Sequence, residues 1–184
     1  MNHNRKDIPI YFIGHAHLDP LWQWHWQEGS AEAKATLRSA LDRMKEFPEF
    51  RFVCSSAQLF RWIKEFSPSM FAEIKQRIDE KRFIIVGGWH IQPDCNLPCG
   101  EGYVRQALYS QRFFKENFGV TAEIGYSIDS FGQNIMLPQI LKKSGMPYYV
   151  YQRPSEEENP MNNLYLFDWV SPDGTSVRTY HLRV

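Results

Sequence analysis

Histidine and aspartate side chains are concentrated in the stretch HAHLDPLWQWHW, residues 15–26, which directly follows an apolar run. Within it His15, His17 and Asp19 alternate along the chain, and alternate residues of an extended segment point to the same side. Imidazole nitrogen and carboxylate oxygen are both good zinc ligands, and a catalytic zinc keeps one coordination position open. The spacing therefore predicts a metal site. It leaves two pairings open, His15 with His17 or His17 with Asp19.

Three later segments carry chemically active side chains after apolar runs that read as strands. Trp89, His90 and Asp94 follow the third such run, Asp129 follows the fourth, and Arg153 ends the fifth. The carboxyl ends of parallel strands meet at one edge of a sheet or barrel, so we expect these residues to gather at one mouth. Any one of them alone would also fit an ordinary surface loop.

Asp129, Arg153 and three aromatic side chains could belong to the same site. Asp129 precedes a Ser-Phe-Gly turn, where its carboxylate could act as a nucleophile, a base or a metal ligand; a local turn is the alternative. Arg153 could hold that carboxylate through a charge-assisted hydrogen bond, or pair instead with the acidic run 156–158. Trp22, Trp89 and Phe131 could offer ring faces to a sugar, or could simply be core residues.

Alternating strand and helix patterns must position these side chains. Expected strands cover residues 8–14, 51–56, 83–88, 122–129 and 148–153, and expected helices cover residues 30–47, 57–66, 68–82, 102–119 and 137–145. This alternation is typical of βαβ units with a mostly parallel sheet, and leaves a barrel and a doubly wound sheet both open. At the end of the chain two β-rich runs flank Pro-Asp-Gly at 172–174, which predicts a hairpin.

Composition narrows the class of protein. The 184 residues suit one domain, and the equal numbers of basic and acidic residues, 21 each, argue against nucleic acid or an anionic membrane as a partner. No window offers the roughly 18 apolar residues of a membrane span, and the charged N-terminus does not resemble a signal peptide. Three cysteines, an odd number without the regular spacing of a disulfide framework, favour a reducing compartment. We expect a soluble, cytoplasmic protein.

Four motifs resemble, in order and spacing, those of glycoside hydrolase family 38, the α-mannosidases of bacterial and cytosolic type. They are HAHLDPLW, GGWHIQPDCNLPCGEGYVRQ, SIDSFGQNIMLPQILKKSGM and YQRP. The resemblance implies an α/β fold with mostly parallel strands, an irregular (β/α) barrel of the glycoside hydrolase/deacetylase type that is incomplete in this chain. It also implies a zinc-dependent retaining exo-glycosidase that removes terminal α-linked mannose from oligosaccharides or glycans through a covalent mannosyl-enzyme.

The resemblance also implies roles for individual residues. Asp129 matches the catalytic nucleophile and, with His17 and Asp19, a ligand of one Zn²⁺ per active site. The matched substrate-binding positions are Trp22, Asp94, Phe131 and Arg153.

Two features of the resemblance limit what it implies. In the family the acid/base carboxylate and a histidine that is the fourth zinc ligand lie downstream of the arginine motif, and none of Asp94, Glu101 and Asp168 matches the acid/base. Residues 1–184 are therefore expected to be the N-terminal portion of the catalytic domain, inactive in isolation and able to form a homo-oligomer that covers exposed apolar surface. Gln133 stands where the family commonly has histidine, which puts in doubt any hydrogen bond made by that histidine.

Two rival functions remain open at this stage. One is a metal-dependent amide or ester hydrolase that uses His15 and His17 as its metal arm. The other is a non-catalytic carbohydrate-binding fragment with Trp22, Trp89 and Phe131 as its platform. In the leading hypothesis the partner is a mannose-containing oligosaccharide, and neither nucleic acid nor a membrane is a partner.

Overall fold

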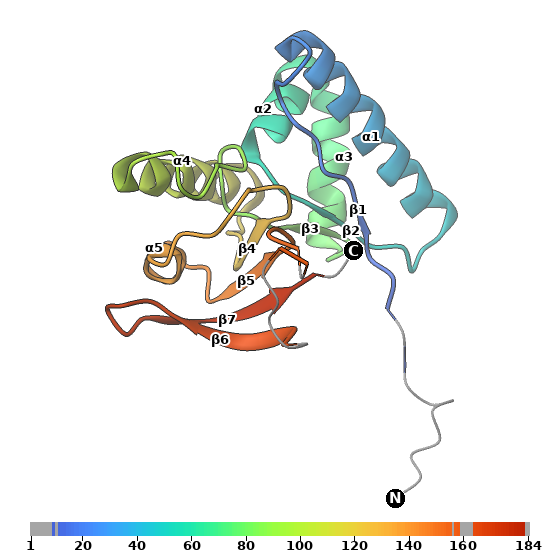
Figure 1. Ribbon diagram of the computed structural model, residues 1–184. Coiled ribbons are helices and arrows are strands. Elements are labelled where there is room, and N and C mark those ends of the chain that lie inside the picture. Colours follow the sequence, from blue (N-terminus) through green and yellow to red (C-terminus); the bar gives the residue numbers. More distant parts are fainter. Residues whose placement is uncertain (1–8, 10, 156, 159–163, 183–184) are drawn as a thin grey trace, which may run out of the picture.

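The computed structural model describes residues 9, 11–155, 157–158 and 164–182. Within them the strands are β1 (Gly14–His15), β2 (Phe52–Cys54), β3 (Phe83–Ile85), β4 (Ile124–Ser127), β5 (Tyr148–Tyr151), β6 (Leu166–Val170) and β7 (Ser176–His181). The helices are α1 (Trp26–Glu46), α2 (Ala57–Phe66), α3 (Pro68–Asp79), α4 (Gly100–Phe118) and α5 (Leu137–Lys143). Strands and helices alternate as far as β5, except that both α2 and α3 lie between β2 and β3, and the hairpin follows (Figure 1).

The strands form two sheets that a backbone hydrogen bond connects. β1, β2 and β3 pair in parallel in that order, and so do β4, β5 and β7. The Gly87 amide donates to the Ile124 carbonyl oxygen at 2.7 Å, which links the end of β3 to β4. β6 pairs with β7 antiparallel across the Asp-Gly turn, which confirms the predicted hairpin. Its second strand nevertheless continues the parallel sheet beside β5.

The predicted α/β class with mostly parallel strands is confirmed, whereas the predicted barrel is not. Among the described strands, β1 and β6 lie at the outer edges of the two sheets, and no pairing between them closes the structure. The arrangement is therefore open over the described part of the chain.

Helices α1, α2 and α3 group beside β1–β3 (Figure 1), and a shared core holds them there. The apolar residues of α1 that recur every three or four positions are buried, as their spacing predicts. Phe60 of α2 lies at the centre of this core. Its ring meets the rings of Phe83, Phe114 and Phe118 edge-on, with centroids 5.6 to 5.9 Å apart.

Helix α4 joins this first core to a second one under β4 and β5. Its Phe113 and Phe114 belong to the first core, whereas Tyr103 and Ala107 belong to the second, together with residues of α5 and β5. A side chain at Gly125 of β4 would approach Leu141 of α5 to 2.3 Å, so this glycine lets α5 pack directly on the strand. The strand that precedes Asp129 is thus held on a packed support.

The first predicted strand differs most from the structure. The sequence predicts a buried strand over residues 8–14, of which 8 and 10 lie outside the described residues. The strand begins only at Gly14, and the side chains of Tyr11 and Phe12 are 81% and 90% exposed. The reason is that β1 pairs with β2 alone among the described strands, so no described neighbour covers the residues before it.

Helix starts also differ from the prediction. Helix α1 begins at Trp26 rather than after Ser30, because the Glu28 carboxylate accepts a hydrogen bond from the His25 amide at 2.9 Å and so caps an earlier turn. Helix α4 begins at Gly100, two residues before the prediction, and ends at Phe118, where Gly119 in the left-handed conformation is the expected C-cap.

No helix in the described part of the chain combines the length and the apolar character needed to cross a membrane.

Candidate metal centre and active site

Three functional side chains stand at equivalent positions after three parallel strands. His17 lies two residues beyond the end of β1, Asp129 two beyond β4, and Arg153 two beyond β5. β4 and β5 are parallel neighbours, so Asp129 and Arg153 lie at the same edge of their sheet, and His17 Nε2 lies 3.8 Å from Asp129 Oδ2. The structure therefore brings together His17, Asp129 and Arg153, three of the residues that the sequence predicted would meet.

His17, Asp19 and Asp129 form a cluster with the geometry of a metal site. His17 Nε2 lies 3.1 Å from Asp19 Oδ1 and 3.8 Å from Asp129 Oδ2, and one ligand atom from each residue lies within 4.8 Å of the other two. Tetrahedral zinc with bonds of about 2.0–2.2 Å would set its ligand atoms about 3.3–3.6 Å apart. One imidazole and two carboxylates fit Zn²⁺ in donor type, and the two separations from His17 Nε2, 3.1 and 3.8 Å, lie close to this range.

Asp129 is held from a second side by Arg153. The Arg153 Nε donates to Asp129 Oδ1 at 2.6 Å, a short charge-assisted hydrogen bond. Both side chains are a little over one third exposed, so they face a solvent-accessible mouth rather than the core. The guanidinium carbon also lies 4.7 Å from the centre of the Phe131 ring. Of the two partners that the sequence left open for Arg153, Asp129 is the one that the structure shows.

Two exposed rings lie in the segments that carry the metal ligands. The side chains of Trp22 and Phe131 are 66% and 65% exposed, and Trp22 meets Trp24 edge-on. Both can therefore receive the apolar face of a ligand. Trp89 cannot, because it is fully buried against Tyr103 in the second core. Of the two interpretations that the sequence left open for Trp89, the core residue is the one that the structure shows.

The histidines separate into different roles. His15 is outside the metal cluster; its Nε2 is buried and has no hydrogen-bond partner among the described residues. Burial, with a smaller contribution from the charge of His17, lowers the pKa of His15 to about 4. The proposed arm of His15 with His17 therefore gains no support, and the pairing of His17 with Asp19 is the one that forms. His25 is exposed just before helix α1, where its backbone amide donates to the Glu28 carboxylate.

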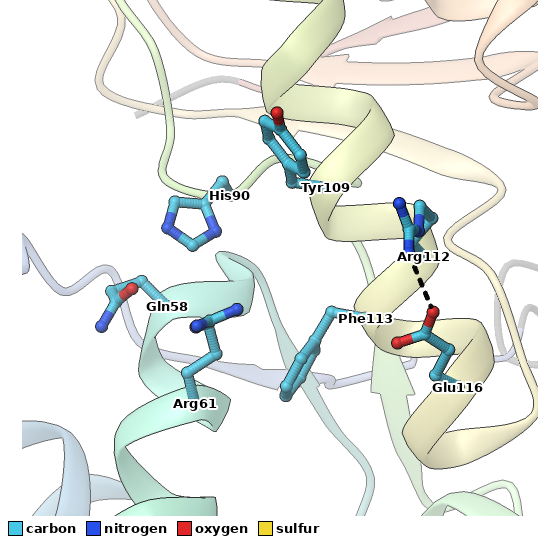
Figure 2. A pocket seen from close by; sticks show the side chains of 7 residues that line it. All are labelled: Gln58, Arg61, His90, Tyr109, Arg112, Phe113 and Glu116. Carbon is cyan, nitrogen blue, oxygen red and sulfur yellow. Dashed lines mark hydrogen bonds and ion pairs between the residues drawn. The ribbon is translucent and has the colours of Figure 1, made fainter.

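His90 lies in a different pocket. Figure 2 shows it facing Gln58 and Arg61 of α2 and side chains of α4, around a cavity of about 480 Å³. Burial, with the nearby charge of Arg61, lowers the pKa of His90. The expectation that it joins the other residues at one mouth is wrong, because the loop after β3 turns it between the two helices.

Three other acidic residues, Asp94, Glu101 and Asp168, bind groups outside this cluster. Asp94 accepts hydrogen bonds from the amides of Asn96 and Leu97, at 2.9 and 3.2 Å, and so caps its own loop. Glu101 pairs with Arg105 on α4, and Asp168 pairs with Arg178 on the hairpin. The Asp94 loop still borders the site, since a side chain at Gly132 would approach Asn96 to 2.8 Å.

Sequence reasoning missed the side chains that hold the Asp129 loop. Gln92 accepts a hydrogen bond from the Ile128 amide at 3.0 Å, and Ser130 donates to the Pro93 carbonyl oxygen at 2.8 Å. Trp24 similarly donates to the Asp19 carbonyl oxygen at 3.3 Å. Their partners are backbone groups of segments 5 to 37 residues away, so spacing along the chain carries no signal of them.

Comparison with known proteins adds a sequence family to this geometry. The family model described as Glycosyl hydrolases family 38 N-terminal domain matches residues 7–184. Alpha-mannosidase G of Dictyostelium discoideum is 33% identical over 184 residues, which cover 97% of this chain and 16% of that protein. Alpha-mannosidase 2C1 of Homo sapiens is 35% identical over 170 residues, covering 91% and 16%. The chain thus spans about a sixth of the length of these relatives.

Solved structures show the same fold. An alpha-mannosidase from Enterococcus faecalis V583 superposes with a TM-score of 0.81 at 20% identity, over 92% of this chain and 19% of that one. A 4-alpha-glucanotransferase from Thermococcus litoralis superposes with a TM-score of 0.74 at 18% identity, over 93% and 27%. At these identities the likeness concerns the fold alone.

Proposed function

Because the chain belongs to glycosyl hydrolase family 38, we propose that it supplies the nucleophile, the metal ligands and part of the sugar subsite of an α-mannosidase. The reaction would be retaining hydrolysis of terminal α-linked mannose from an oligosaccharide or glycan. The observation that carries this proposal is the convergence of His17, Asp19 and Asp129 within 4.8 Å. It is reinforced by curated relatives that are named alpha-mannosidases.

The proposed cofactor is one Zn²⁺ held by His17, Asp19 and Asp129. The spacing and the mixed nitrogen and oxygen donors support this choice. When bound, the ion would supply a Lewis acid that holds two hydroxyl groups of the mannose. Side chains of the protein would carry out the bond-making and proton-transfer steps.

Asp129 is the proposed nucleophile. One carboxylate oxygen would attack the anomeric carbon while the glycosidic C–O bond breaks, forming a mannosyl ester. A second carboxylic acid, about 5 Å away in retaining enzymes, would give its proton to the departing oxygen. It would then take a proton from the water that attacks the ester, which releases mannose and restores Asp129. None of Asp94, Glu101 and Asp168 is assigned this acid/base role, because none of them matches its position in the family.

Arg153, Trp22, Phe131 and Asp94 would surround the sugar. Arg153 orients the Asp129 carboxylate through the 2.6 Å hydrogen bond and offsets its negative charge. Trp22 and Phe131 would stack against apolar faces of the substrate, which their exposure supports. Asp94 would contribute to substrate binding by holding the loop that lies beside Gly132. Three cysteines without a disulfide framework support the proposed cytoplasmic setting.

Covalent trapping tests the function. The full-length gene product should hydrolyse an aryl α-mannoside, and a 2-deoxy-2-fluoro-mannosyl fluoride should leave a mass adduct on the peptide that contains Asp129. An enzyme that hydrolyses amides or esters through metal-bound hydroxide would give no such adduct. A protein that binds mannose equally well after chelation and hydrolyses no mannoside would be a carbohydrate-binding module instead. Either result would overturn the proposal.

A further inference from the structure

The backbone at Arg153 is held by a side chain from the Asp129 loop. Gln133 lies four residues after Asp129, and its Nε2 donates to the Arg153 carbonyl oxygen at 2.8 Å. Its Oε1 accepts from the Tyr149 hydroxyl at 2.6 Å. A flipped amide would set its oxygen against the Arg153 carbonyl oxygen, so these two partners fix the orientation of the amide.

Tyr149 gives this amide a rigid reference. Its side chain is 1% exposed, and its ring stacks on Tyr151 and lies against Trp169. Burial raises the pKa of Tyr149 well above its usual range, so the hydroxyl keeps its proton and remains a donor. The Cys95 thiol approaches the same Gln133 oxygen at 3.5 Å. The amide oxygen is thus tied to the second core rather than to solvent.

His181 of β7 holds the residues on either side of Arg153. Its Nε2 lies 3.0 Å from the carbonyl oxygens of both Gln152 and Pro154. The ring is buried and stacks on Tyr151, with centroids 4.6 Å apart and planes 8° from parallel. Three consecutive carbonyl groups, at 152, 153 and 154, therefore have side-chain partners.

We propose that Gln133 is a positioning residue for Arg153: it couples the loop of the nucleophile to the end of β5, so that the Arg153 Nε stays 2.6 Å from Asp129 Oδ1. The catalytic consequence rests on the proposed function, whereas the structural consequence does not. Arginine has a long flexible side chain, and its backbone must be fixed for one hydrogen-bond geometry to dominate. Supporting side chains of this kind typically change activity by about 10- to 100-fold when removed.

Nuclear magnetic resonance of arginine side chains tests the positioning directly. In the protein, the Arg153 Nε–H proton should be shifted downfield and exchange slowly with water. Gln133→Ala should broaden or lose this signal. Gln133→His should keep it, because a neutral imidazole also offers one donor and one acceptor.

Gln111→Ala is the matched control. The Gln111 amide also bridges backbone groups, donating to the carbonyl oxygens of Ala122 and Ser144 and accepting from the Ala122 amide. Its removal should leave the Arg153 signal intact. A signal that persists in Gln133→Ala, or one lost equally in Gln111→Ala, would overturn the proposal. So would its complete loss in Gln133→His. If Gln133→Ala does not fold, Tyr149→Phe, which removes one hydroxyl group, should speed the exchange of the same proton.

Kinetics of the full-length gene product provide the second measurement. Gln133→Ala should lower kcat for an aryl α-mannoside by roughly 10- to 100-fold with KM changed by less than about threefold, and Gln133→His should restore most of kcat. A wild-type protein that hydrolyses no mannoside would refute the proposed function but not the positioning role. The magnetic resonance comparison would still test the positioning role. An unchanged Arg153 signal with full mannosidase activity in Gln133→Ala would sink the positioning role alone.

Discussion

Replacement of Asp129 by asparagine separates its chemical role from its structural one. The change keeps the shape of the side chain but removes the negative charge that Arg153 binds at 2.6 Å. A hydrogen bond to a charged group contributes about 1.5–3 kcal/mol, and a neutral one about 0.5–1.5. Since both partners are more than one third exposed, screening limits the loss of stability to about 1 kcal/mol. In a chain of this length that corresponds to a fall in Tm of about 2–4 °C.

The effect on turnover should be far larger. An amide oxygen is a poor nucleophile, so Asp129→Asn should lower kcat for an aryl α-mannoside at least roughly 1,000-fold, an increase of about 4 kcal/mol in the barrier. Asp168→Asn is the control, because Arg178 Nε also lies 2.6 Å from Asp168 Oδ1 but on the exposed hairpin. It should leave turnover unchanged. Turnover of Asp129→Asn within tenfold of wild type, or an equal loss in Asp168→Asn, would refute the assignment of the nucleophile.

Three other predictions concern the metal and the stability of the fold. His17→Ala should weaken zinc binding by at least about tenfold in equilibrium dialysis, because it removes the only nitrogen ligand of the described cluster; unchanged affinity would place the metal elsewhere. Hydrogen bonds from Arg38 lower the pKa of Glu73 to about 2 from 4.5, so this pair stabilises the fold above pH 4.5 and loses that contribution as the pH falls towards 2. Glu73→Gln should therefore lower the free energy of unfolding, measured with urea at pH 7, by about 1–2 kcal/mol, a value reduced for the one-third exposure of Arg38. At pH 2.5 the loss should be much smaller, and an equal loss at both pH values would contradict this pH dependence. Leu37→Ala, at a fully buried position, should cost about 2–5 kcal/mol and lower the Tm measured by calorimetry, and a loss below about 1 kcal/mol would argue against this core.

Local patterns in the sequence determined the elements and the set of residues worth considering. Helical spacing identified the buried face of α1, and the turn at 172–174 identified the hairpin. These signals are readable because helix periodicity and turn chemistry depend on residues close together in the chain. The motifs also indicated His17, Asp129 and Arg153, which lie after three separate strands; Asp129 and Arg153 meet at one edge because β4 and β5 are parallel neighbours.

The tertiary structure decided what each candidate contacts. His90 lies between α2 and α4 and Trp89 is buried, although both follow the same strand as Asp94. The Gln133 amide connects Tyr149 to Arg153 across 16 and 20 residues. Such contacts depend on how loops return over the sheets. Every residue type has a backbone carbonyl group, so the sequence does not show which carbonyl group a side chain will bind. Chain order therefore indicated which side chains could do chemistry, and packing decided which of them face one another.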